Sequence, residues 1–232
     1  MTVGSVPSTA RAATGRNLAV IAARAWRVHV AGADRVPSLG PVLLASNHTG
    51  FLDGLVLAAA SPRPVHVLAD ADLFAPPLER LLRGTGQIPM AHRAADRAAL
   101  RTAAGVLRGG GVVGIFPEAE RGAGDVAHAG PTAAYLAART GALLVPVAIL
   151  GTRPSGAGRD ALPRLGSRIE VVIGSPVGVS VAGDPSRRAV LAGSGERIRQ
   201  LLADHVRDAS HQTGLDLPGP LPHSTHHTRS DS

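Results

Sequence analysis

The chain has 232 residues, enough for one α/β domain with a single core. It contains no cysteine, which excludes disulfides, thiolate metal sites and a cysteine nucleophile. All 24 basic residues are arginine and the formal net charge is +7, so an anionic partner is favoured, although a GC-rich coding sequence explains the arginines equally well. Aromatic residues make up only 2% of the chain, which leaves few stacking platforms and argues against nucleic acid.

The first predicted element is an amphipathic helix over residues 11–29. Its apolar residues, including Leu18, Ile21 and Trp26, recur at steps of three and four, with arginines between them. This helix either packs on the domain or lies in a lipid headgroup layer, anchored by Trp26 and the arginines. We therefore treat residues 1–30 as an N-terminal element with possible membrane contact. No run of about 18 apolar residues follows, so no membrane-spanning helix is expected.

Strands and helices then alternate along residues 31–211. The predicted strands are 42–45, 65–68, 87–89, 112–116, 143–149 and 169–173, and the predicted helices are 52–60, 76–83, 94–108, 131–139 and 186–210. The last helix is expected to be interrupted at Gly193 and Gly195. Such alternation predicts a single α/β domain with a mostly parallel central sheet flanked by helices. Residues 212–232 have little to bury and should form a flexible tail.

The segment from Asn47 to Asp53 carries the clearest chemical signal. His48 follows an apolar strand, at the edge where open α/β sheets place their reactive groups, and Asp53 comes five residues later. On one continuous helix these side chains would point about 140° apart, so they meet only if His48 stands in a turn and Asp53 begins the next helix. A carboxylate on one ring nitrogen leaves the other free to accept a proton. An ordinary cap-and-turn pair is the alternative.

Charged residues also follow the strand at 112–116. Glu118 and Arg121 should lie at the same sheet edge as His48 if the strands are parallel, and Arg121 is suited to bidentate phosphate binding. Arg93, which follows the short strand at 87–89, is a second candidate phosphate ligand. Each of these residues is alternatively an ordinary surface charge. The glycine pattern at 109–114 opens a strand instead of a helix, so it predicts no dinucleotide site.

Four stretches, in this order, resemble the four conserved blocks of the glycerolipid acyltransferases, which include 1-acylglycerol-3-phosphate acyltransferase. They are residues 47–53 (Asn-His, four residues, Asp), 86–93, 116–122 and 145–151. The resemblance covers residues 28–177. A match to any one block is weak evidence for the family, but four matches in the right order form a specific pattern.

The resemblance implies an enzyme in which His48 is the base on the acceptor hydroxyl and Asp53 orients it. It further implies that Arg93, Glu118 and Arg121 bind the phosphate and glycerol of a lysophospholipid acceptor. The acyl group would pass directly from acyl-CoA or acyl carrier protein, with no cofactor and no metal. The expected place of action is cytoplasmic, as a peripheral protein on the anionic inner face of the cell membrane.

The sequence departs from the family pattern around the phosphate site. Ala119 and Glu120 stand where the third block usually has glycine and then threonine or serine, and Arg93 comes one residue late, with His92 in its usual place. In a strand, a shift of one residue reverses the face on which a side chain lies. Two alternatives therefore stay open: another lysolipid or glycolipid acceptor, or a catalytically silent lipid-binding relative.

Overall fold

The computed structural model describes residues 6–91, 96–118, 120–179 and 188–222. Eight strands in these ranges form one sheet in the order β1-β7-β6-β2-β5-β3-β4, with β8 paired to β6. The strands are β1 (Arg27–Ala31), β2 (Val42–Ser46), β3 (Val65–Asp70), β4 (Ile88–Met90), β5 (Val112–Ile115), β6 (Leu143–Leu150), β7 (Arg168–Ile173) and β8 (Val177–Gly178). Neighbours are parallel except that β6 is antiparallel to β7 and β8. The expected single α/β domain with a mostly parallel sheet is confirmed.

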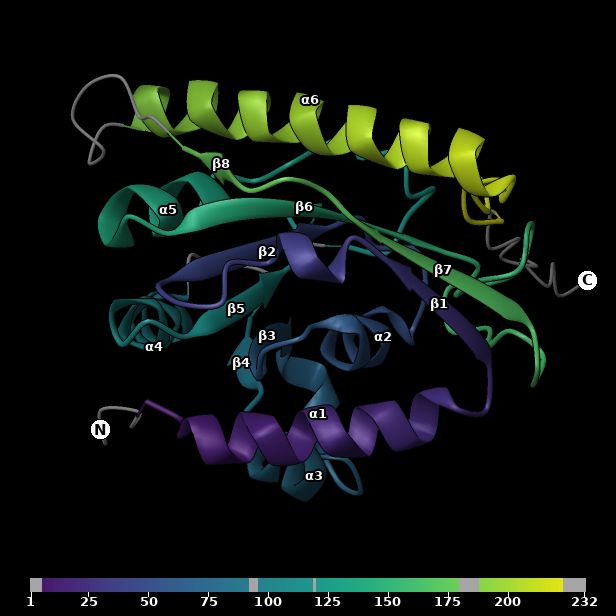
Figure 1. Ribbon diagram of the computed structural model, residues 1–232, viewed down its shortest axis with the longest axis horizontal. Coiled ribbons are helices and arrows are strands. Elements are labelled where there is room, and N and C mark those ends of the chain that lie inside the picture. Colours follow the sequence, from purple (N-terminus) through teal and green to yellow (C-terminus); the bar gives the residue numbers. More distant parts are fainter. Residues whose placement is uncertain (1–5, 92–95, 119, 180–187, 223–232) are drawn as a thin grey trace, which may run out of the picture.

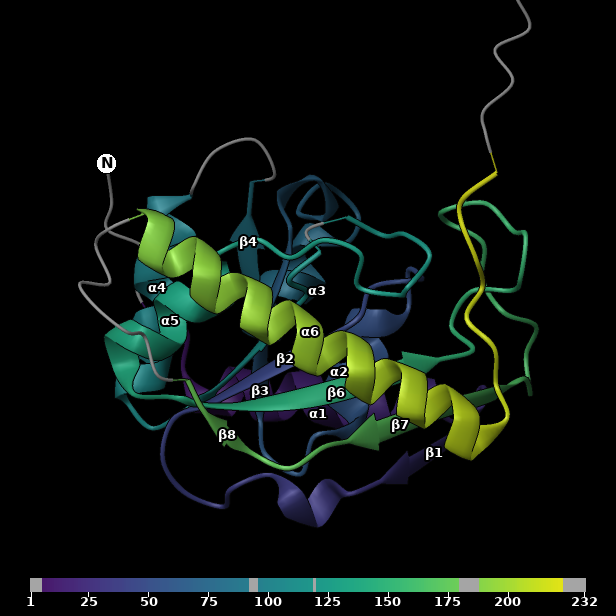
Figure 2. The same ribbon diagram turned by 90° about the horizontal axis from the view of Figure 1, so that it is seen from above.

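Helices cover both faces of the sheet (Figure 1). They are α1 (Thr9–Ala23), α2 (Asp53–Ala60), α3 (Glu79–Gly84), α4 (Arg97–Arg108), α5 (Thr132–Thr140) and α6 (Arg188–Thr213). Seen from above in Figure 2, α6 runs diagonally across the sheet. No helix in the described ranges is long and apolar enough to cross a bilayer.

The two faces have separate cores because the side chains of each buried strand alternate between them. On β2, Val42 and Leu44 pack with α2 and part of α1, whereas Leu43 and Ala45 pack with α4 and α5. A third cluster joins α6 to β6 and β7. Both faces of the central strands are thus covered, and functional side chains are left to the strand ends.

The N-terminal region differs from the prediction in two ways. The helix ends at Ala23, and Arg27–Ala31 forms the edge strand β1, which pairs in parallel with β7. Of the two readings of this region, packing on the domain or anchoring in lipid, the structure gives Trp26 the first: it is partly buried against the core and its indole N–H donates to the carbonyl of Pro163 at 3.1 Å. Trp26 therefore holds the segment before β7 and does not serve as a free membrane anchor.

The face of α1 that packs on the domain consists of small residues and not of the larger apolar ones. Ala12, Gly15, Ala19 and Ala23 are buried, and α1 packs along α2. A Cβ on Gly15 would lie 2.8 Å from Thr85, so the close approach requires glycine there. Leu18 and Ile21 point outward, with 45% and 60% of their surface exposed. Small residues permit tighter helix packing, which explains why the larger side chains remain outside.

Two predictions for the C-terminal region were wrong. The helix α6 is continuous through Gly193 and Gly195, because the burial of Ile198, Leu202 and Val206 outweighs the low helix propensity of glycine. The segment 214–222, expected to be part of a flexible tail, is held against the domain: Leu215 and Leu217 are partly buried there. The rest of the expected tail, residues 223–232, lies outside the described residues.

Candidate active site

His48 and Asp53 are brought together where β2 ends and α2 begins. His48 lies in the turn two residues after β2, and Asp53 is the first residue of α2. The Nδ1 atom of His48 lies 2.8 Å from Oδ2 of Asp53, whose side chain is completely buried. Since a carboxylate only accepts hydrogen bonds, Nδ1 carries the ring proton and Nε2 remains an acceptor.

The carboxylate of Asp53 is fixed by several other donors. Its Oδ2 also accepts from the backbone N–H groups of Thr49 at 2.6 Å and Gly50 at 2.9 Å. Its Oδ1 accepts from the hydroxyl of Thr152, which in turn lies 2.9 Å from the hydroxyl of Thr49. Gly50 is needed in this turn because a Cβ there would lie 2.7 Å from the carbonyl oxygen of Thr152. The imidazole is therefore oriented by a carboxylate that has little freedom to move.

Asn47 joins the end of β2 to β6. Its side-chain oxygen accepts from the N–H of Ile149 at 2.8 Å, and its amide nitrogen donates to the carbonyl of Ile149 at 3.0 Å. The last backbone pair between β2 and β6 is Ser46 with Val147. One residue later, the side chain of Asn47 takes over the hydrogen bonding to β6 from the backbone of β2. Asn47 fixes the point at which the chain leaves the sheet and turns His48 toward the cavity.

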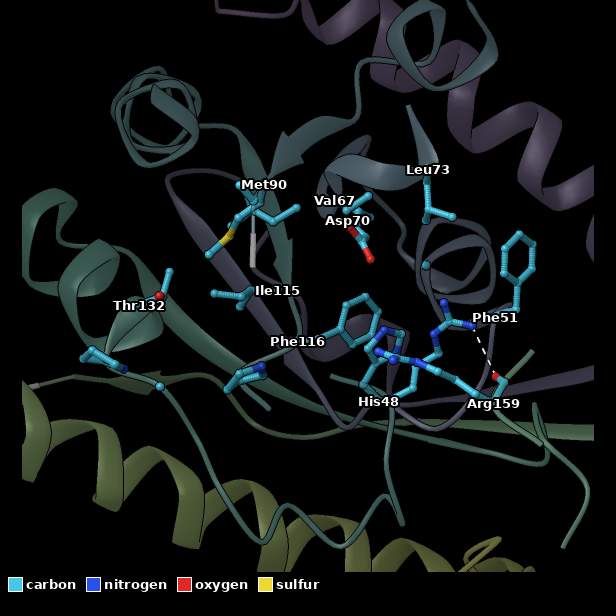
Figure 3. A pocket seen from close by; sticks show the side chains of 18 residues that line it. His48, Phe51, Val67, Asp70, Leu73, Met90, Ile115, Phe116, Thr132 and Arg159 are labelled. Atoms are coloured by element: carbon cyan, nitrogen blue, oxygen red, sulfur yellow. Dashed lines mark hydrogen bonds between the residues drawn. The ribbon is translucent and has the colours of Figure 1, made fainter. Parts of the chain in front are cut away.

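The loop after β5 holds the backbone of His48. The N–H of His48 donates to Oε1 of Glu118 at 3.3 Å, and the carbonyl of His48 accepts from the N–H of Gly122 at 2.9 Å. The ring of His48 stacks on Phe116, with centroids 4.2 Å apart and planes at 20° (Figure 3). Glu118 and Arg121, the two charged residues predicted to follow this strand, therefore lie at the same sheet edge as His48.

Glu118 has an unusual protonation equilibrium. Burial raises its pKa from 4.5 to about 8, the hydrogen bond from His48 opposes this shift, and the negative charges of Asp125 and Asp53 add to it. At neutral pH the carboxyl group is therefore mostly protonated and can donate a hydrogen bond.

Glu118→Gln should remove a pH dependence of stability. Folded Glu118 keeps its proton up to about pH 8, whereas the unfolded side chain releases it near 4.5, so the free energy of unfolding of the wild type falls as pH rises between these values. Glutamine has no such proton. We expect the variant to gain about 4 kcal/mol relative to wild type between pH 5 and pH 9, measured by urea unfolding. Parallel pH profiles for the two proteins would contradict the raised pKa.

A cavity of about 340 Å³ opens beside His48, at the carboxyl ends of β2, β5, β3 and β4. Figure 3 shows apolar side chains from several elements around it, among them Leu73, Met90 and Ile115. The volume lies in the range of small-molecule pockets, which are usually apolar with a few placed polar groups. His48, with 19% of its side chain exposed, is one of those polar groups.

Arg121 also lines this cavity, on the side where a second, more polar hollow begins. Its guanidinium carbon lies 5.7 Å from the centre of the Phe51 ring. Arg93 lies outside the described residues, so its expected place beside Arg121 stays a prediction. Within those residues, no group of three or more His, Asp or Glu side chains is arranged to hold a metal ion.

Sequence reasoning missed Thr152 and Arg153, which directly follow the fourth conserved stretch. Arg153 is 3% exposed and donates to four backbone carbonyls, those of Thr49 at 3.0 Å, Ala157 at 2.7 Å, Gly122 at 3.0 Å and Gly219 at 2.5 Å. Burial lowers the pKa of Arg153, and the charge of Asp53 opposes that shift. The one available signal was their position at the carboxyl end of β6, next to the strand that carries His48.

Thr152→Val should weaken catalysis without disrupting the fold, because valine keeps the shape and removes the hydroxyl that bonds Asp53. A hydrogen bond to a charged group contributes about 1.5–3 kcal/mol, so kcat should fall roughly 10-fold or more while KM stays within twofold. Thr140→Val, which removes a hydroxyl bonded to Leu136 at the end of α5, is the matched control and should change neither constant. Equal kcat values for the two variants would show that Thr152 does not support Asp53.

The site thus combines a histidine oriented by a buried carboxylate with an apolar cavity and a nearby arginine, an arrangement that can support general-base chemistry. A sequence model of the acyltransferase family matches residues 27–150, and the chain belongs to that family. No curated protein sequence matches the chain.

One solved structure with a similar fold is the crystal structure of the 1-acyl-sn-glycerophosphate (LPA) acyltransferase, PlsC, from Thermotoga maritima. The match has a TM-score of 0.58 and 19% sequence identity, and it covers 85% of this chain and 78% of that chain. At this identity the likeness concerns the fold.

Proposed function

We propose that this acyltransferase moves a fatty acyl group from acyl-CoA or acyl carrier protein to a free hydroxyl of lysophosphatidate. The observation that carries the proposal is the His48 ring, held by Asp53 through Nδ1, on the wall of a cavity that also contains Arg121. The apolar walls suit acyl chains, and the guanidinium suits the phosphate of the acceptor.

In the proposed reaction, Nε2 of His48 accepts the proton of the acceptor hydroxyl as its oxygen attacks the thioester carbonyl. The tetrahedral intermediate then expels the thiolate, which takes the proton from the imidazolium and leaves as the thiol. A C–O bond forms, a C–S bond breaks, and no acyl-enzyme is needed. Asp53 keeps the ring in the tautomer that accepts at Nε2 and stabilises the imidazolium. In this proposal Glu118 keeps the role that the family resemblance implies, contact with the acceptor's glycerol, beside its bond to the backbone N–H of His48.

A peripheral position on the cytoplasmic face of the membrane is part of this proposal. The outward face of α1 presents Leu18 and Ile21 together with the exposed Arg24, which suits contact with an anionic lipid surface.

Acceptor profiling with the purified protein tests the proposal. Lysophosphatidate, other lysophospholipids and a glycolipid are offered with acyl-CoA and with acyl carrier protein, and transfer to lysophosphatidate should be fastest. A preference for another lysolipid would move the acceptor assignment; the acidic side chains of Asp70, Asp72 and Glu120 around the second hollow favour that alternative. Binding to anionic vesicles with no acylation of any acceptor would identify a silent lipid-binding relative.

A further inference from the structure

Arg121 is held firmly on the cavity wall. Only 10% of its side chain is exposed, and it lies over the ring of Phe51. Its NH1 group donates to Oδ1 of Asp160 at 2.6 Å and to the carbonyl of Arg159 at 3.2 Å; the dashed line ending at Arg159 in Figure 3 marks the second bond. Both partners come from the irregular segment between β6 and β7, which lies outside the four stretches that resemble the family's blocks.

The ion pair with Asp160 is suited to being displaced. Asp160 is 76% exposed, so its carboxylate lies at the solvent edge of the site, where water weakens its attraction to Arg121. A phosphate monoester carries up to two negative charges and three acceptor oxygens, and therefore binds a guanidinium better than one exposed carboxylate does.

The loop that carries Asp160 is fixed at both ends and exposed between them. Arg153 binds the carbonyl of Ala157 at 2.7 Å, and Trp26 binds the carbonyl of Pro163 at 3.1 Å. Between these anchors, Gly158, Arg159 and Asp160 are exposed. The Asp160 side chain can therefore rotate away from Arg121 while the anchors and Arg159 stay in place, since that side chain is 76% exposed.

A second cation lies in the same place. Arg159 lines the cavity beside His48 and also the polar hollow next to it, and Arg121 and Asp160 line that hollow with it. When Asp160 leaves, two guanidinium groups face the space into which an anionic headgroup would extend. Two cations on one phosphate match its charge better than Arg121 alone.

We propose that Asp160 is a placeholder for the acceptor's phosphate on Arg121, and that Arg159 becomes the second phosphate ligand once Asp160 is displaced. Asp160 then sets acceptor specificity: it is expelled by a phosphate monoester and keeps acceptors without that charge from binding at Arg121. This inference rests on the proposed acyl transfer for its biological meaning. It requires only phosphate binding at Arg121 for its test.

The test compares Asp160→Asn, Arg159→Gln and, as the matched control, Asp204→Asn, which breaks an exposed Asp–Arg pair on α6. With lysophosphatidate as acceptor, Asp160→Asn should lower KM about 3- to 10-fold, because the competing charge is gone, while kcat changes less than twofold. Arg159→Gln should raise KM about 10-fold. The control should match wild type. The difference between Asp160→Asn and wild type should shrink as salt is added.

Isothermal titration calorimetry of glycerol 3-phosphate binding measures a dissociation constant without turnover. The dissociation constant should fall in Asp160→Asn and rise in Arg159→Gln by the same factors. An unchanged or higher KM and dissociation constant in Asp160→Asn would overturn the placeholder role, and an unchanged KM in Arg159→Gln would overturn the second-ligand role. If these binding shifts occur but no acceptor is acylated, the proposed function fails and this inference stands.

Discussion

Replacing His48 with alanine should abolish acyl transfer and leave the fold intact. Among the described residues that line the cavity, the imidazole is the one group that combines a free basic nitrogen with a fixed orientation, because Nδ1 is bonded to Asp53 and the ring lies on Phe116. General-base catalysis contributes about 10²- to 10⁴-fold, so kcat for acyl transfer should drop by at least ~10³-fold when orientation is lost as well. The measurement is thiol release from acyl-CoA in the presence of lysophosphatidate.

The control for this variant is His211→Ala, which removes an exposed histidine at the end of α6. Its rate should equal that of the wild type. Thermal unfolding of His48→Ala should remain cooperative, since the lost side chain is partly exposed and its backbone bonds to Glu118 and Gly122 persist. Near wild-type transfer by the folded His48→Ala protein would falsify the assignment of His48 as the base.

The position of this pair could be predicted because it depends on local rules. A strand of apolar residues ends at Ser46, a helix begins at Asp53, and reactive groups in such folds gather at the carboxyl ends of the strands. Five residues of spacing then leave a turn for His48 and the first helical turn for Asp53. Their catalytic role stays a prediction until the variants are measured.

The rest of the site depends on contacts between distant segments, which residue spacing does not encode. Thr152 reaches Asp53 across 99 residues of sequence, and Arg153 reaches Thr49 across 104. Residues 152–163 are rich in glycine, proline and arginine, a composition typical of exposed loops. Arg153 in this loop is nevertheless among the most buried polar residues. The same limit explains β1, whose strand character comes from pairing with β7 more than 100 residues later.

Changing Arg153 to methionine should produce the largest loss of stability among these variants. Methionine has a similar length but no donor, so the carbonyls of Thr49, Ala157, Gly122 and Gly219 lose a common partner. Each unsatisfied buried polar group costs about 1–3 kcal/mol, and water will reach the more exposed carbonyls. We expect the free energy of unfolding to fall by roughly 4 kcal/mol, measured by urea unfolding.

The activity of this variant distinguishes positioning from general support of the fold. The carbonyls of Thr49 and Gly122 belong to the segments that hold His48, and the carbonyl of Gly219 ties residues 214–222 to those segments. Without Arg153 the turn that carries His48 should loosen. We therefore expect kcat to fall about 10-fold at a temperature where the variant is folded. Arg63→Met is the matched control: Arg63 bonds the carbonyls of Pro37, Gly40 and Gly110 at the amino ends of β2 and β5, away from the cavity. It should destabilise the protein while kcat stays near wild type. If both variants lowered kcat equally, Arg153 would be acting only through stability, and the catalytic turn would have to be held by Thr152 and Asn47 alone.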